Sequence, residues 1–334
     1  MGRIKVYATN FGVDEPNPYY DMFANSLCTY NKAFTVVRNI DQADILLLFT
    51  PTEFAYTPDI ALMKSAGDKK VVLINASEGW SFYGKTREFG YKVLQPENVI
   101  LAFNTHHQKG NVHHTKEGIK KYDFIFPIYP LDPVWNSIQT NHIPQDKITF
   151  LNRANNLEII CSCFSISRKR MLDVVKNWKG RTFVHDSMHS PRLPINEVYK
   201  KQEESKICIS VEGGSYKMVR HQEIVLNSVV AIHPYDYEYS FPWIDGFNCI
   251  VLPYDGNTEP FDKIDIERGG WYRYLGGPEV QECKTKLQYY INNGDELYTM
   301  YLNSLKTAEN YKPSNYYGNY IGNKILETYR CSLG

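Results

Sequence analysis

The sequence predicts an α/β protein made of two domains, each with a doubly wound parallel sheet. Short apolar runs alternate with helical segments in both halves of the chain, as expected for consecutive βαβ units. The run Ala43–Phe49, ADILLLF, is apolar without alternation, which is typical of a parallel strand buried on both faces. At 334 residues the chain is long enough for two domains of ordinary size.

In the first half, a strand at Arg3–Thr9 is followed by a turn-rich loop and a helix at Tyr19–Tyr30. Further strands are predicted at Ala33–Val37, Ala43–Phe49, Lys70–Asn75, Val99–Phe103 and Asp123–Ile128, with a helix at Asp59–Ser65. The histidine-rich stretch between the last two strands is expected to be a polar loop. Residues 127–155 are rich in Pro, Asn and turn formers, so we place a domain boundary near residue 150 and a first domain at 1–150.

The second half repeats the alternation and is assigned to a domain at 151–310. Strands are predicted at Leu157–Cys163, Thr182–His185, Lys206–Val211, Val229–His233 and Asn248–Pro253. Helices are predicted at Ser167–Trp178, Asn196–Glu204, Tyr216–Asn227, Gly277–Asn292, Asp295–Glu309 and Asn315–Tyr329. The last of these helices belongs to a segment, 311–334, that is expected to return toward the first domain.

Composition excludes several classes of protein. The hydrophobic share of 43 % and the charged share of 22 % are those of a globular protein. Lys plus Arg and Asp plus Glu both number 37, so no overall charge favours nucleic acid as a partner. No apolar run approaches the roughly 18 residues that a transmembrane segment needs. Without a secretory leader or paired cysteine spacing, cytoplasmic localisation with reduced thiols is expected.

The strand, turn and helix at Ser205–Asn227 form the strongest candidate for a ligand site. The turn consists of Glu212, Gly213, Gly214 and Ser215. A glycine turn that opens a helix presents backbone N–H groups and the positive end of the helix dipole to an anion. Arg220 adds a planar fork suited to phosphate, and Glu223 offers acceptors suited to a ribose diol. The competing interpretation is a structural ion pair on an ordinary βαβ helix.

Redox, P-loop and metal chemistry are disfavoured by the motifs. Neither half carries GxGxxG after its first strand, nor GxxxxGK[ST]. Asp236 and Glu238 form the nearest acidic pair and are predicted to lie in a loop. The adjacent histidines, His106-His107 and His113-His114, lack the spacing of zinc ligands. No resident metal is therefore expected.

Three segments carry a resemblance to a known family. They are FSISRKRMLDVV at 164–175, SKICISVEGGSYKMVRHQEIVLNSVVAIHPYDYEYSFPW at 205–243, and EVQECKTKLQYYINNGDELYTMYLNSL at 279–305. Residues from about 157 to 330 resemble the donor domain of GT-B glycosyltransferases, in its exostosin-like form. The resemblance implies two Rossmann-like domains facing across a cleft, with C-terminal helices packing back.

The same resemblance implies a nucleotide-diphosphate sugar as donor, with UDP favoured, and no metal or other cofactor. Arg220 would hold the diphosphate and Glu223 the ribose hydroxyls. Of Arg168, Lys169 and Arg170, which open the first helix of the same domain, Arg168 at the strand–helix junction is the predicted second positive charge on the diphosphate. The competing interpretation of this run is a solvated helix start. His185, at a strand end, is expected to touch the donor or to satisfy a turn. The implied activity is that of a hexosyl- or pentosyltransferase acting on an oligosaccharide or glycoprotein acceptor in glycan biosynthesis.

Inverting transfer needs a general base for the acceptor hydroxyl. Glu78 is the predicted base, because it follows the buried strand Lys70–Asn75 closely and Gly79 allows close approach. Asp14, His106 and His107 remain alternatives, and retaining chemistry would need no such base. Two competing functions stay open: a GT-B-like nucleotide-sugar epimerase, and a non-catalytic bilobal protein that binds sugar or nucleotide.

Overall fold

A computed structural model of the chain forms two compact units. Unit 1 comprises Met1–Ser137 and Tyr311–Gly334, and unit 2 comprises Ile138–Asn310. The structure describes residues 2–10, 18–49, 67–75, 98–104, 112–115, 118–121, 125–127, 144–161, 166–187, 189–211, 219–234, 243–254 and 278–334.

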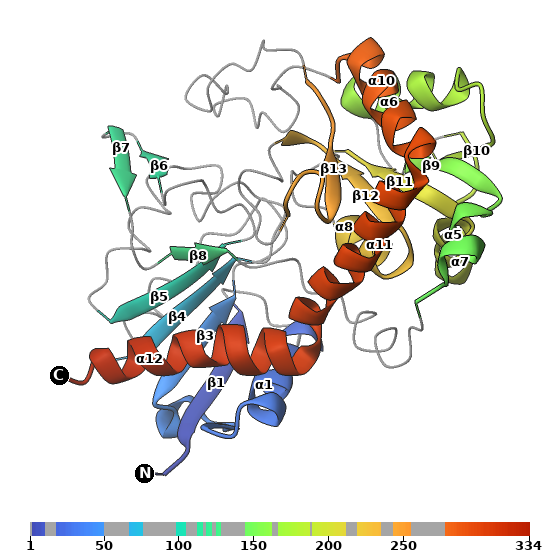
Figure 1. Ribbon diagram of the computed structural model, residues 1–334. Coiled ribbons are helices and arrows are strands. Elements are labelled where there is room, and N and C mark those ends of the chain that lie inside the picture. Colours follow the sequence, from blue (N-terminus) through green and yellow to red (C-terminus); the bar gives the residue numbers. More distant parts are fainter. Residues whose placement is uncertain are drawn as a thin grey trace. The chain divides into compact units, whose positions relative to one another are not determined.

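Unit 1 is built on a parallel sheet of six strands in the order β2-β1-β3-β4-β5-β8 (Figure 1). The strands are β1 (Ile4–Asn10), β2 (Phe34–Val36), β3 (Ile45–Phe49), β4 (Lys70–Asn75), β5 (Val99–Asn104) and β8 (Ile125–Pro127). All five residues of β3 are buried, as its unbroken apolar sequence predicts for a central parallel strand. A short 3-10 turn, η1 (Ile40–Gln42), precedes it and is capped by the Asn39 side chain.

Helix α1 (Pro18–Tyr30) packs against both the sheet and the C-terminal segment. Phe23 is fully buried, and its ring meets those of Phe49 and Tyr317 edge-on at 5.2 and 5.5 Å between centroids. Gly318 allows the close approach, because a side-chain carbon added there would lie 2.8 Å from the carbonyl oxygen of Tyr30. The C-terminal segment is therefore an integral part of unit 1.

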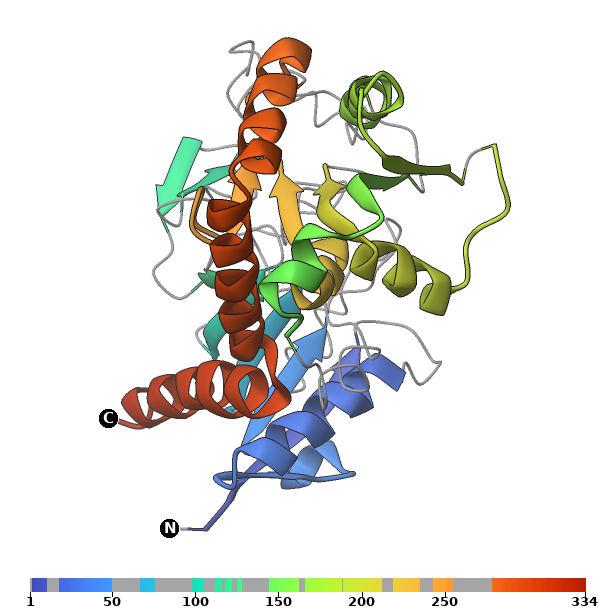
Figure 2. The same ribbon diagram turned by 45° about the vertical axis from the view of Figure 1, so that its right-hand side comes forward.

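That C-terminal segment differs from its predicted form. In place of one α-helix at 315–329, a 3-10 turn η5 (Glu309–Tyr311) leads into a π-helix η6 (Ser314–Gly322) and then α12 (Asn323–Cys331). Figures 1 and 2 show η6 and α12 as one continuous helical run. The Lys324 ammonium lies 4.1 Å from the centre of the Phe126 ring, so α12 is tied to the end of β8.

The histidine-rich stretch also departs from expectation. Part of it forms a two-stranded antiparallel hairpin of β6 (Val112–Thr115) and β7 (Gly118–Lys121), where a polar loop was predicted. His113 and His114 are consecutive strand residues, paired with Lys120 and Ile119.

Unit 2 contains a second parallel sheet, in the order β10-β9-β11-β12-β13. The strands are β9 (Asn155–Cys161), β10 (Thr182–Asp186), β11 (Ser205–Ser210), β12 (Val229–Ile232) and β13 (Cys249–Val251). The helices are α5 (Lys147–Leu151), α6 (Ile166–Lys176), α7 (Ile195–Glu203), α8 (Val219–Asn227), α10 (Val280–Asn292) and α11 (Gly294–Ala308). Helix α5, capped by Asp146, lies within the stretch predicted to be turn-rich.

The strands of unit 2 divide their side chains between two faces. Leu157, Ile159, Ile207 and Ile209 belong to one apolar core that also includes residues of α6, α10 and α11. Because side chains alternate along a strand, the even-numbered residues of β9 and β11 point to the opposite face. On that face the Cys208 thiol donates to a carbonyl of α7.

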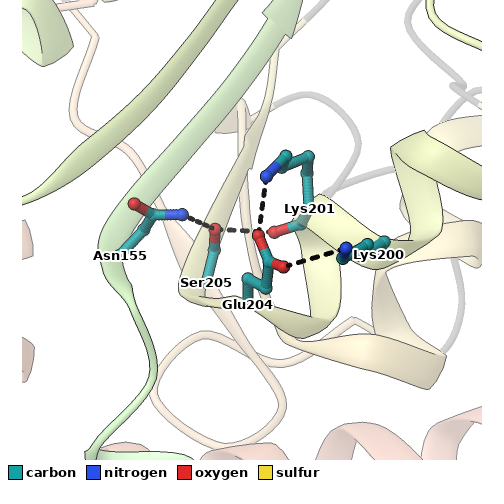
Figure 3. Close-up of polar contacts among 5 residues, drawn as sticks. All are labelled: Asn155, Lys200, Lys201, Glu204 and Ser205. Atoms are coloured by element: carbon teal, nitrogen blue, oxygen red, sulfur yellow. Dashed lines mark hydrogen bonds and ion pairs between the residues drawn. The ribbon is translucent and has the colours of Figure 1, made fainter.

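Hydrogen bonds fix the amino-terminal edge of this sheet (Figure 3). The Ser205 hydroxyl donates to the carbonyl of Lys201 at 2.7 Å, and Asn155 donates to the Ser205 oxygen at 3.4 Å. Glu204 accepts from the Lys201 ammonium at 2.8 Å and lies 4.0 Å from that of Lys200. The polar side chains at this edge thus bond to one another and to the backbone.

The predicted class, α/β with two doubly wound parallel sheets, is confirmed. None of the helices in the described ranges is both long and apolar enough to cross a membrane.

Candidate functional site

The carboxyl edge of the unit 2 sheet has the topology of a ligand site. The chain passes from β9 outward to β10 and then returns to β11 on the other side of β9. In open α/β sheets, ligands bind outside the carboxyl ends of the strands at the point where the order reverses. That point here lies between the ends of β9 and β11, close to where α6 and α8 begin.

Arg220 lies at this edge. It is the second residue of α8, and its Nη1 donates a hydrogen bond to the carbonyl of Ile160 in β9. Its Nε is buried and has no hydrogen-bond partner among the residues described. The guanidinium is therefore held at the carboxyl end of β9 with donor capacity left over.

Arg168 is the second cation at the same place. It lies in the first turn of α6 and is only 5 % exposed. Burial raises the pKa of the Cys161 thiol, the last residue of β9, to about 11, and the charges of Arg168 and Arg220 both act to lower it. The charges of both guanidinium groups affect the pKa of the Cys161 thiol, so the two cations lie near the same end of β9.

Glu223 follows Arg220 by three residues on α8 and is half-buried. Burial raises the pKa of Glu158 in β9 to about 7; the charge of Arg220 opposes the rise, and that of Glu223 adds to it. Arg220 and Glu223 of α8 thus both affect the pKa of Glu158, as expected for two residues on a common helix face.

The end of β10 contributes His185 and Asp186. The Nε2 of His185 is buried without a hydrogen-bond partner in the described part of the chain. Asp186 lies beside Cys161 in the sheet register, and its Oδ2 is 2.8 Å from Nδ1 of His189. His185 and Arg168 are therefore at the same edge of the sheet as Arg220 and Glu223.

Three buried side chains at this edge were not predicted from the sequence. His221 and His233 are fully buried, with ring centroids 6.0 Å apart, and the Trp243 ring meets His221 edge-on at 5.9 Å. The Nε2 of His221 lies 3.0 Å from the carbonyl oxygen of Ser210, so this nitrogen carries the proton. The only sequence signal for His221 is its position next to Arg220.

The buried carboxyl group of Glu158 was missed as well. It is the single charged residue in the strand NNLEIIC and is 0 % exposed. An isolated Glu within an apolar strand was the available signal.

Seven of the predicted site residues lie outside the described residues. They are Asp14, Glu78, His106, Glu212, Gly213, Gly214 and Ser215, and His107, the further alternative for the base, lies outside as well. Within the ranges that are described, no three His, Cys, Asp or Glu side chains form a group that could hold a metal ion.

No protein-family model and no curated protein matches this sequence. Solved structures do match its fold. An α1,3-fucosyltransferase is 11 % identical with a TM-score of 0.50, over 99 % of this chain and 90 % of that one. A chain of the GtfA/B complex is 12 % identical with a TM-score of 0.52, over 87 % of this chain and 58 % of its own length.

A third match is a structure described as trehalose-6-phosphate from E. coli bound with UDP-2-fluoro glucose. It is 8 % identical with a TM-score of 0.50, over 95 % of this chain and 80 % of the other. Identities this low show a shared fold. The chain therefore has the GT-B fold, with two Rossmann-like α/β domains.

Proposed function

We propose that the protein is a glycosyltransferase that binds a nucleotide-diphosphate sugar, UDP-linked by preference, at the carboxyl edge of the unit 2 sheet. The observation that carries the proposal is the pair of arginines, Arg168 and Arg220, at the end of β9 beside the switch point. Two fixed cations stabilise the negative charge that develops on a leaving diphosphate, which is the role that a divalent metal has in other enzymes.

Other groups at the same edge of the sheet would bind the rest of the donor. Glu223 would accept hydrogen bonds from the ribose hydroxyls, and His185 has a buried ring nitrogen available for the base or the sugar. The turn 212–215, which the sequence places before α8, would supply backbone N–H groups to the phosphates. The fold matches include a fucosyltransferase and a structure bound to a UDP-sugar analogue, which favours sugar transfer over other uses of the fold.

Transfer is proposed to be inverting and metal-independent, to a hydroxyl of an oligosaccharide or glycoprotein acceptor, with a hexose or pentose as the group moved. Glu78 is the proposed base, with Asp14 and His106 as alternatives. An exostosin-like donor domain remains a prediction from the sequence.

The first experiment is a thermal-shift screen with UDP-, GDP- and CMP-sugars, followed by a transfer assay in EDTA. Because a ligand that binds only the folded protein raises its melting temperature, the donor should stand out in the screen. UDP release that depends on added acceptor would support transfer, whereas conversion of the sugar without acceptor would indicate the epimerase. Binding without turnover under all conditions would indicate the non-catalytic protein.

Glu78→Gln tests the base directly. The amide cannot take the proton from the acceptor hydroxyl, so transfer should fall by about 10²-fold or more while donor binding is kept. The change is measured as kcat together with the Kd for UDP. A near-normal kcat would contradict the assignment and direct the search to Asp14 and His106.

A further inference from the structure

Glu158 is a buried acid in the middle of a parallel sheet. It is 0 % exposed, and no N–H or O–H group among the described residues donates to its carboxylate oxygens; the Cys208 thiol beside it is a weak donor. Its neighbours in the strand, Leu157 and Ile159, belong to the apolar core, so its own side chain points to the other face of the sheet. A buried carboxyl group without a strong hydrogen-bond donor is costly to a fold and requires an explanation.

In the described part of the chain, the charged groups with the largest effect on Glu158 lie on α8. Arg220 and Glu223 act on Glu158 from α8, and the Cys208 thiol lies next to it as its register partner on β11. The Cys161 thiol also senses its charge. Among these groups, Arg220 is the single cation, and it is the residue already proposed to bind the diphosphate.

Besides Glu223 on its own helix, Arg220 thus has two possible counter-charges, Glu158 and a bound diphosphate. No ion pair within 4.0 Å joins Glu158 and Arg220, and their interaction acts over a longer distance in a medium of low polarity. With the site empty, an ionised Glu158 attracts the guanidinium toward β9. A bound diphosphate places its own negative charge on the same guanidinium and disfavours the ionised form of Glu158.

We propose that Glu158 is a positioning residue for Arg220, whose carboxyl group takes up a proton from solvent when a diphosphate binds to the guanidinium. This inference rests on the proposed function, since it needs a diphosphate at Arg220. The ligand replaces Glu158 as the counter-charge of Arg220, so that donor binding is coupled to proton uptake. In the ligand-free protein, burial raises the pKa of Glu158 to about 7, so the group is partly ionised near neutral pH and able to respond.

The direction of the pH dependence follows from this coupling. Binding raises the pKa of Glu158 further, so the complex holds more protons than the free protein in the interval between the two values. The affinity for UDP should therefore increase as pH falls from about 9 to about 7, by roughly tenfold for each unit by which the pKa rises. Protonation of the ligand phosphate, at roughly pH 6, acts equally on every variant.

The experiment is isothermal titration calorimetry of UDP with the full chain across this pH range. It compares the wild type with Glu158→Gln, which keeps the shape of the side chain but cannot ionise. Glu204→Gln is the matched control, because Glu204 pairs with Lys201 at the amino-terminal edge of the same sheet. Wild type and Glu204→Gln should show the pH dependence above about pH 7, and Glu158→Gln should lose it.

Proton uptake is measured separately on the wild type, from the binding enthalpy in two buffers of different ionisation enthalpy near pH 8. This measurement needs no variant, so it tests the coupling of UDP binding to proton uptake even if Glu158→Gln fails to fold. UDP binding without net proton uptake, or with the same pH profile in Glu158→Gln, overturns the inference and leaves the proposed function intact. Failure of the folded wild type to bind UDP at any pH overturns both.

Discussion

The two units share a strand order but differ in what they bury. Counted along the chain, the strands of both sheets are arranged second, first, third, fourth, fifth, and unit 1 adds a sixth. In the described part of unit 1, Ser26 is the one polar side chain that is buried. Unit 2 buries two arginines, a glutamate and two histidines, among others: Arg153, Arg168, Glu158, His221 and His233.

In the described residues, the sheet of unit 1 is thus buried as an apolar layer, whereas unit 2 buries the charged residues of the candidate site. The apolar side chains of a strand such as β3 need no hydrogen-bond partners and are stabilised by burial. Buried charges cost free energy unless they are paired, and they persist where they serve binding or catalysis. The two sheets have the same topology but bury different kinds of residue, so the fold alone does not determine which chemistry each can support.

Leu47→Glu should produce the largest effect, because it places a charge in β3, where all five side chains are apolar and buried. Leu47 is fully buried, and the change should destabilise unit 1 by about 4 kcal/mol or more. Denaturant unfolding measures the effect, and Leu47→Met should cost less than about 1.5 kcal/mol. A Glu variant as stable as the Met variant would contradict the view that unit 1 cannot accommodate a buried charge.

Glu158→Gln should have the opposite effect on stability in unit 2. Because the folded pKa of Glu158 is raised to about 7 from 4.5, the native state binds more protons than the unfolded state between these values. Wild-type stability should therefore fall as pH rises through this interval and stay low above it. Glu158→Gln should remove that loss, with a gain of up to about 3 kcal/mol at alkaline pH. Melting curves at acid and alkaline pH test it, and identical profiles for the two proteins would count against an ionisable Glu158.

Arg220→Ala should weaken UDP binding by about 1.5–3 kcal/mol, the range for a hydrogen bond to a charged group. Calorimetry measures it, with Arg220→Lys as the companion that keeps the charge but loses the planar fork. Unchanged UDP affinity in a folded Ala variant would remove the main support for the proposed site.

Ser228→Ala should have the smallest effect. The Ser228 hydroxyl is fully buried, 2.7 and 2.8 Å from the carbonyls of Ser205 and Lys206. Its loss should cost about 1–2 kcal/mol in denaturant unfolding. Ser332→Ala removes a half-buried hydroxyl that donates to one carbonyl, that of Tyr329, and should cost less. Equal costs for the two serines would show that full burial and the second carbonyl contact of Ser228 add little to the stability of unit 2.

The sequence predicts the elements better than it predicts their geometry. Apolar runs identify β3 and β11 almost to the residue, because burial of a parallel strand leaves a direct mark on composition. The hairpin of β6 and β7 was missed, since its residues, VHHT and GIKK, lack a clear alternation. The π-helix η6 was missed because its hydrogen-bond register has no compositional signature.

The candidate site was predictable only in part. Arg220 and Glu223 are close in sequence, so helix periodicity is enough to predict their common face. Glu158 lies 62 residues before Arg220 along the chain. The two come close because β9, which carries Glu158, pairs with β11, the strand that precedes α8. Single-sequence reasoning has no access to that pairing.

The π-helix η6 determines the angle about the helix axis at which α12 begins, because α12 follows it without a break. Each residue of an α-helix turns the chain by about 100°. The i→i+5 hydrogen bonds of η6 turn the chain by less per residue, so the same residues wound as an ordinary α-helix would turn α12 to a different angle. Lys324 would then leave the ring of Phe126, and a different stripe of α12 would meet the sheet. The π-helical winding of Ser314–Gly322 thus determines which face of α12 meets the sheet.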